Sequence, residues 1–256
     1  MELLKVPQLF DYKRFRLHTR PNNKLVIKLQ GLLDEILQER ISLFSRTFPI
    51  KVIHDFSVCH LQDSTIQIDP ELIPFKTHSL DLALSSGPLM FTNDIPGVLK
   101  QWYAALKPGG VFMAAFFGEE SLIELKECFF KAEEKLQISH ELRFFPTIAT
   151  KDAGLLVQRA GFHSPTADKT RLTLHAKNLT DLLHTLKALG GNILHERSRS
   201  SISKKFLNTV ESEYHKSYSD ESGLRVTVDI VCMTGWAIER CANELINQQT
   251  PKIGYL

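Results

Sequence analysis

Apolar and polar positions along the chain follow helical and extended periods in turn, and this alternation predicts the elements. Residues 24–45 place leucine and isoleucine three and four positions apart, as in an amphipathic helix. Residues 50–58 and 64–69 are rich in β-branched side chains, which is typical of strands. The other expected elements are strands at 79–86, 110–118, 171–176 and 223–236, helices at 94–106, 119–136 and 152–162, and helix-rich sequence at 179–218.

Strands that alternate with helices predict an α/β fold, with a largely parallel sheet covered by helices on both faces. The last two strands are the expected exception, an antiparallel pair with a helical cap inserted between them. The expected division is an N-terminal helical segment at 1–47, an α/β core at 48–176, the cap at 177–222, the last core strand at 223–237 and a tail at 238–256.

Composition narrows the class of protein. The 256 residues are 43% hydrophobic and carry a formal net charge of +2, which does not favour nucleic acid as a partner. No apolar run approaches the ~18 residues of a membrane span, and the first 20 residues lack the order of a secretory signal. The four cysteines are scattered, which indicates free thiols in a reducing compartment. We therefore expect a bacterial cytoplasmic protein, with the mitochondrial matrix as the alternative.

One long segment resembles a known family. "IDPELIPFKTHSLDLALSSGPLMFTNDIPGVLKQWYAALKPGGVFMAAFFG" (68–118) is similar to the second half of a class I S-adenosylmethionine-dependent methyltransferase of methyltransferase type 11. More closely, it resembles the branch that holds the complex I assembly factors and the biotin-pathway malonyl carrier-protein methyltransferases. Further segments resemble the assembly factors; they lie at 9–20, 152–162, 182–192 and 228–237. The resemblance implies a Rossmann-like fold, S-adenosylmethionine as cofactor and a protein or carrier-protein substrate.

The chain departs from the family pattern where the cofactor loop is expected. In such enzymes the first strand enters a Gly-x-Gly loop, but here no glycine occurs between Leu32 and Ser86. Only 59–63 separate the first two predicted strands, whereas a parallel crossover needs about a dozen residues. We therefore expect those strands to form an antiparallel hairpin, unless one of them is not a strand. The cofactor-binding half of the fold is then truncated.

Four residues are candidates for cofactor contact. By resemblance, Asp69 matches the acid that faces the adenine amino group, although a surface acid before a proline is the simpler interpretation. Ser85, Ser86 and Gly87 come at the carboxyl end of a predicted central strand, where open α/β sheets bind ligands. Gly87 also fits a simple turn. No catalytic residue stands out.

Two further groups have an ordinary explanation beside a functional one. His54, Cys59 and His60 lack the second ligand pair of a zinc site, so no metal is expected. The basic cluster "HERSRSSISKK" (195–205) suits a phosphopantetheine arm or an acidic partner, but a solvated approach to a helix is commoner.

These observations leave two hypotheses. In the first, the chain is a pseudo-enzyme that keeps the fold, has lost usual cofactor binding and acts through contacts with a protein partner, as in assembly of a respiratory complex. In the second, it is an active enzyme that methylates a protein or carrier protein, or hydroxylates a protein arginine.

Overall fold

The structure is a computed structural model that describes residues 8–11, 24–55, 58–61, 64–67, 69–138, 143–144, 146–189 and 202–238. Its elements in chain order are α2 (Lys24–Ser42), β1 (Lys51–Asp55), β2 (Val58–Leu61), β3 (Ser64–Gln67), β4 (Leu80–Ser86), η1 (Pro88–Phe91), α3 (Ile95–Ala105), β5 (Leu106–Phe117), α4 (Ile123–Leu136), α5 (Thr150–Ala160), β6 (His163–Ala176), α6 (Leu179–Ala188), α7 (Lys204–Tyr218), β7 (Ser219–Asp220) and β8 (Gly223–Trp236).

The strands in the described part of the chain belong to one sheet. Its order is β3-β2-β1-β4-β5-β8-β6, and β7 pairs with β8. The parallel pairs are β1 with β4 and β4 with β5, whereas β8 is antiparallel to both β5 and β6. The fold is therefore α/β and Rossmann-like, as predicted, but the sheet is mixed and the expectation of a largely parallel sheet was wrong.

The segment after β1 differs from the prediction in detail. Strands were expected at 50–58 and 64–69, but three short strands occupy this stretch because the connecting residues form β2. β2 is antiparallel to both β1 and β3, so β1 and β3 do not pair with each other. In the described part of the chain, no helix lies between β1 and β4.

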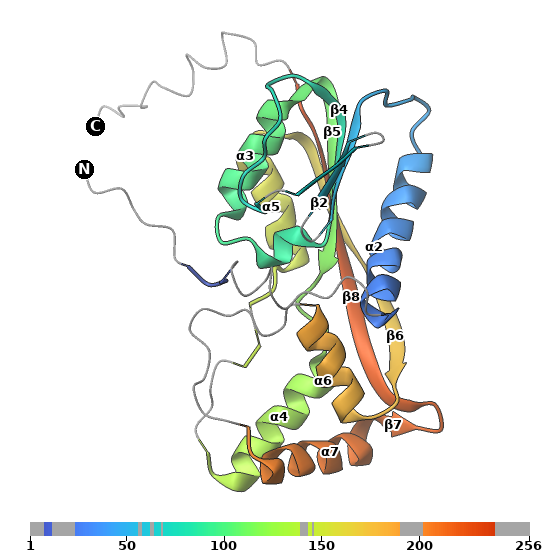
Figure 1. Ribbon diagram of the computed structural model, residues 1–256, viewed down its shortest axis with the longest axis vertical. Coiled ribbons are helices and arrows are strands. Elements are labelled where there is room, and N and C mark those ends of the chain that lie inside the picture. The colour runs from blue at the N-terminus through green and yellow to red at the C-terminus, as the bar shows by residue number, and fades with distance from the viewer. Residues whose placement is uncertain are drawn as a thin grey trace, which may run out of the picture.

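Helices cover both faces of the sheet (Figure 1). On one face α3 and α5 bury apolar side chains against β4 and β5, with Trp102 and Phe112 fully enclosed. The second cluster holds Leu33 and Leu37 of α2 together with side chains of α4, α6 and α7. Each fully buried leucine or phenylalanine contributes about 1.5–3 kcal/mol, so these two clusters dominate the stability of the fold.

The entry to β5 combines a bend with a strand. A strand was expected from residue 110, but β5 already begins at Leu106, and its register with β4 shifts between Leu80 and Leu82. Gly109 has a φ of 79°, a value that favours glycine. A Cβ on Gly110 would lie 2.8 Å from the carbonyl oxygen of Lys107. The two glycines therefore let the chain turn and enter the sheet at once.

The helices α6 and α7 lie between β6 and β8 in the chain, where the helical insertion was expected. β6 and β8 are each 14 residues long and extend past the other strands. Figure 1 shows α4, α6 and α7 grouped beside this extension, apart from α3 and α5. We call α4, α6 and α7 the lower helices. The helix at 119–136 was predicted from its apolar spacing, and its regular part begins at Ile123.

Candidate functional site

The carboxyl ends of β1 and β4 lie side by side, and two of the four candidate residues are buried there. In the parallel register His54 is opposite Ser85 and Asp55 is opposite Ser86. Ser85 and Ser86 are 1% and 0% exposed. Gly87 follows with a φ of 102° and leads directly into η1. The sequence therefore placed these three candidates correctly at the end of a central strand.

The hydroxyl group of Ser86 is engaged by α2. It donates a hydrogen bond to Asp34 Oδ1 at 2.6 Å and accepts one from Gln30 Nε2 at 2.7 Å. Gln30 Nε2 also lies 3.2 Å from the carbonyl oxygen of Ser86. Side chains of α2 therefore use the hydrogen-bonding groups of Ser86 at the end of β4.

The opposite face of this edge holds polar atoms with no hydrogen-bond partner. His54 and Ser85 point toward α3, since neighbouring residues at one register position share a face. Within the described residues, neither ring nitrogen of His54, nor Ser85 Oγ, nor Trp102 Nε1 is hydrogen-bonded, although all are buried. The His54 ring lies 6.0 Å from the Trp102 ring. Burial lowers the pKa of His54 to about 4, so its imidazole is neutral at pH 7.

Asp69 lies in the loop between β3 and β4. Its Oδ1 accepts a hydrogen bond from the backbone N of Glu71 at 3.0 Å, and its carbonyl oxygen accepts one from Leu72. The carboxylate therefore organises its own turn, as in the simpler interpretation. Neither Ser85 nor Ser86 is hydrogen-bonded to it.

Asp81 has a structural place at the start of β4. It accepts hydrogen bonds from the backbone N of Ile50 and from Lys107 Nζ, both at 2.9 Å. Burial acts to raise the pKa of Asp81, but the bonds from Lys107 and Ile50 outweigh it and lower the pKa. This aspartate ties the entries of β1, β4 and β5 together.

The geometry around β1 does not favour a metal. His60 is the register partner of Ile53, whereas His54 is the next residue along β1, so the two histidines project to opposite faces. His60 Nε2 lies 3.2 Å from Asp55 Oδ2. Within the described residues, no group of three metal-ligating side chains occurs.

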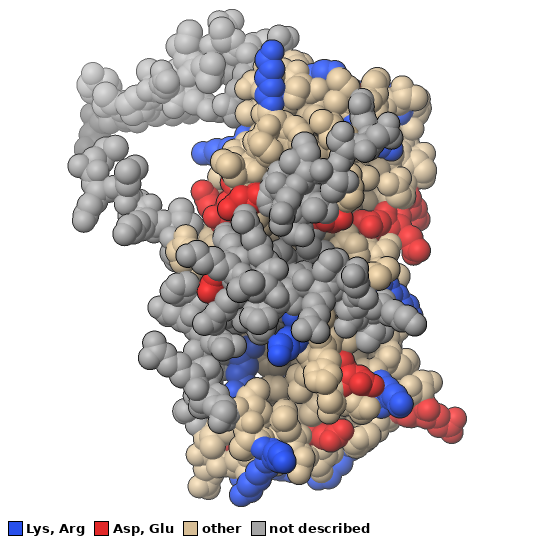
Figure 2. Space-filling view, viewed as in Figure 1, with Lys and Arg blue, Asp and Glu red and all other residues tan. Residues whose placement is uncertain are grey.

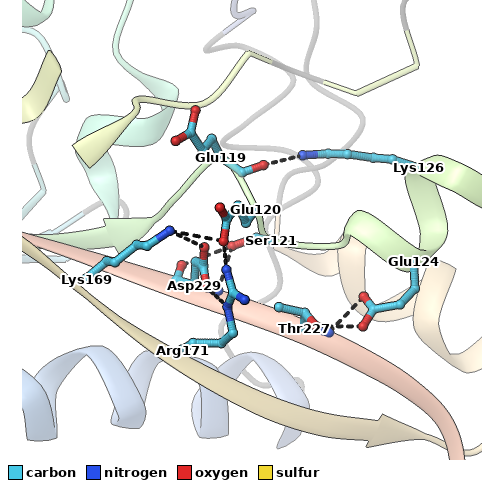
Figure 3. A network of polar contacts seen from close by, with 9 residues as sticks. All are labelled: Glu119, Glu120, Ser121, Glu124, Lys126, Lys169, Arg171, Thr227 and Asp229. Atoms are coloured by element: carbon cyan, nitrogen blue, oxygen red, sulfur yellow. Dashed lines mark hydrogen bonds and ion pairs between the residues drawn. The ribbon is translucent and has the colours of Figure 1, made fainter. Parts of the chain in front are cut away.

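A second polar cluster was not predicted from the sequence. It joins the loop before α4 to β6 and β8, where the lower helices meet the sheet (Figure 3). Asp229 of β8 is 1% exposed and accepts a hydrogen bond from Arg171 Nε at 2.9 Å, with Lys169 Nζ at 3.7 Å. Both cations also pair with Glu120. The sequence signal was one acid inside the apolar run "VDIVCM".

The same cluster fastens α4 to β8. Glu124 is 2% exposed, and its carboxylate accepts hydrogen bonds from the backbone N and the hydroxyl group of Thr227, at 3.0 and 2.6 Å. Ser121 Oγ accepts a bond from the backbone N of Asp229 and donates one to its carbonyl oxygen. The buried side chains of Asp229, Glu124 and Ser121 all have hydrogen-bond partners, so the cluster is a structural junction.

Comparisons with known proteins show which family the chain resembles. Residues 53–114 match a family model described as "Methyltransferase domain". The chain is homologous to methyltransferase-domain proteins. A relative in Rattus norvegicus, "Arginine-hydroxylase NDUFAF5, mitochondrial", is 31% identical over 172 residues, which are 67% of this chain and 50% of the relative. The family resemblance drawn from 68–118 is thereby confirmed.

The second branch of the resemblance is also represented. "Malonyl-[acyl-carrier protein] O-methyltransferase" of Xylella fastidiosa (strain M23) is 27% identical over 170 residues, which are 66% of this chain and 56% of the relative. The chain spans about half the length of the curated relatives it matches. Among solved structures, a putative methyltransferase from Bacillus halodurans C-125 covers 81% of this chain and 99% of its own, with 11% identity and a TM-score of 0.49.

None of the helices in the described part of the chain combines the length and the apolar character that a membrane span requires.

Proposed function

We propose that this methyltransferase-related chain does not hold S-adenosylmethionine in the usual way and acts through contacts with a protein partner, in the manner of a respiratory-complex assembly factor. The observation that carries the proposal is the path of the chain after β1. A Gly-x-Gly loop leading into a helix offers backbone N–H groups and a positive helix end to the cofactor. Here β1 is followed by two short antiparallel strands, with no glycine from Leu32 to Ser86.

The candidate residues themselves support the proposal. Ser86 is bonded to Gln30 and Asp34, and Asp69 is bonded within its own turn. Ser85 and His54 are buried on the other face, where the His54 ring lies 6.0 Å from the Trp102 ring. Ser86 and Oδ1 of Asp69 are thus engaged within the protein, and the backbone N–H groups of a Gly-x-Gly loop are missing from the sequence after β1, so hydrogen bonds worth ~1 kcal/mol each to the cofactor are lost. We derive no methyl-transfer step through this edge.

The lower helices supply a surface for a partner. On α4 the side chains of Ile123 and Phe130 are 42% and 51% exposed and lie seven residues apart, on one side of the helix. Aromatic side chains are enriched in the contact regions of protein interfaces. The assembly role places the protein in a bacterial cytoplasm or in the mitochondrial matrix.

An active enzyme is the second candidate, and one observation favours it. Polar atoms of His54, Ser85 and Trp102 are buried and have no hydrogen-bond partner among the described residues, at the edge where α/β sheets bind ligands. On this alternative the chain is a methyltransferase or an arginine hydroxylase that acts on a protein or a carrier protein. A polar ligand would then satisfy those atoms.

Thermal unfolding with and without cofactor separates the two. If the protein bound S-adenosylmethionine with a dissociation constant of about 10 µM, 1 mM cofactor would stabilise it by about 2.7 kcal/mol. For a chain of this size that shifts the melting temperature by roughly 5–10 °C. We predict no shift with S-adenosylmethionine or S-adenosylhomocysteine. A concentration-dependent rise that is abolished in Ser85→Val, but kept in the exposed control Lys151→Gln, would show a cofactor site at this edge and would refute the proposed loss of cofactor binding.

A further inference from the structure

A groove runs along α7 beside the end of α4. It has a volume of about 500 Å³ and is lined by Lys135, Lys205, Asn208, Thr209, Ser212, Glu213 and Lys216. Figure 2 shows Lys and Arg side chains at the lower end of the molecule, where Figure 1 places α4 and α7. This groove is separate from the edge of β1 and β4 and from the polar junction at β8.

The spacing of the lining residues gives the groove its length. Lys205, Asn208, Ser212 and Lys216 recur every three or four residues, so they form one exposed stripe of α7. The opposite side of the helix buries Phe206, Val210 and Tyr214 in the core. At 1.5 Å per residue, about 16 Å separates the two terminal lysines.

The groove has an excess of positive charge. Its single acid, Glu213, accepts from Lys135 Nζ at 2.6 Å and lies 3.3 Å from Lys216 Nζ. These hydrogen bonds, that of Lys135 first, lower the pKa of Glu213, so the carboxylate is ionised. Three lysines thus face one carboxylate, a net charge of +2. Within the described residues, Lys205 Nζ has no ion pair or hydrogen bond.

Neutral donors lie between the two ends of the stripe. Asn208 and Ser212 are exposed, and their side chains make no hydrogen bond to the described residues. A row of amide and hydroxyl donors between two cationic ends suits a ligand with several acceptor oxygens along its length. A single phosphate group reaches only one end of the row, whereas about five residues of extended chain span ~16 Å.

We propose that this groove binds an acidic, extended segment of a protein partner. The proposal rests on the proposed function, because it names the chemistry of the partner that a contact-dependent protein would recognise. Lys205 and Lys216 pair with carboxylates at the two ends of the segment, and Asn208 and Ser212 donate to its backbone or side-chain oxygens. Glu213 holds Lys135 and Lys216 in position from below.

The experiment is a titration of the full chain with fluorescein-labelled hexaglutamate, followed by fluorescence anisotropy at low salt. We expect saturable binding that weakens steeply as salt rises, because exposed charge pairs are screened. The double variant Lys205→Gln/Lys216→Gln should bind about tenfold more weakly. The control Lys76→Gln/Lys151→Gln removes the same charge from exposed lysines elsewhere and should bind as the parent does. Circular dichroism checks that all three proteins are folded.

Several results would overturn the proposal. These are absence of saturable binding, an equal loss in both double variants, or displacement of hexaglutamate by inorganic phosphate at lower molar concentration than unlabelled peptide. Binding through Lys205 and Lys216 to vesicles of phosphatidylcholine and phosphatidylglycerol, without binding to the peptide, would assign the groove to a membrane surface. A parallel titration with S-adenosylmethionine keeps the two proposals separate. Binding of the cofactor would refute the proposed function. If the chain binds neither the cofactor nor the peptide, only the proposal for the groove is refuted.

Discussion

We expect substitutions of Arg171 and Asp229, which form an ion pair, to differ in how much they destabilise the protein. The side chain of Asp229 is 2% exposed, whereas that of Arg171 is 55% exposed. Removing the arginine leaves a buried carboxylate, but removing the carboxylate leaves a cation that can turn to water. We therefore expect Arg171→Met to destabilise the protein more than Asp229→Asn does, although the arginine is the exposed partner.

The cost of each substitution in stability depends on which charged neighbours remain around Asp229 or Arg171. Removing one partner of a buried pair costs 3–5 kcal/mol. We place Arg171→Met near the lower end, at about 3 kcal/mol, because Lys169 Nζ is 3.7 Å from Asp229 Oδ2 and can move closer. In Asp229→Asn, Arg171 keeps Glu120 as a partner, and the loss is one charged hydrogen bond, about 1.5 kcal/mol.

Urea denaturation at pH 7 measures both values, with Lys151→Met as an exposed control for loss of a long cation. A larger cost for Asp229→Asn than for Arg171→Met would refute the reasoning.

Three further predictions concern other parts of the fold. Burial lowers the pKa of His54 to about 4, so the stability that its neutral imidazole contributes is complete above pH 6.5 and is lost as pH falls toward 4. Urea denaturation should therefore give a free energy of unfolding about 2 kcal/mol lower at pH 5 than at pH 7. His54→Leu should remove this part of the pH dependence. Asn178→Ala should cost about 1 kcal/mol, since Asn178 Oδ1 caps α6 by accepting from Asp181 N at 2.8 Å; an unchanged melting temperature would contradict this. Gly235→Ala should cost about 1–3 kcal/mol in chemical denaturation, because its Cβ would lie 2.6 Å from Phe162 Cβ; a neutral result would show that the contact relaxes freely.

The elements with strong periodicity were predictable from the sequence. A helix was expected at 94–106, and α3 occupies Ile95–Ala105, where the carboxylate of Asp94 accepts a hydrogen bond from the backbone N of Gly97. The antiparallel order of β6 and β8 was also expected, with the helical insertion between them. β2 was not, because four residues without strict alternation carry no clear strand signal. The start of β6 was missed as well, since this edge strand buries little of its surface.

The candidate site was predictable only in part. The end of a buried strand indicated where Ser85 and Ser86 lie, because that position depends on the local pattern. Ser86 accepts a hydrogen bond from Gln30 and donates one to Asp34, both more than 50 positions away in the chain, and helix periodicity does not encode these bonds. The Asp229 junction likewise depends on which strands become neighbours.

The central claim is that the edge formed by β1 and β4 does not hold the cofactor of the family. Calorimetric titration of the folded chain with S-adenosylmethionine and S-adenosylhomocysteine tests it most directly, with circular dichroism to show that the sample is folded. The account predicts no heat of binding at millimolar ligand. Saturable binding at micromolar concentration would contradict it.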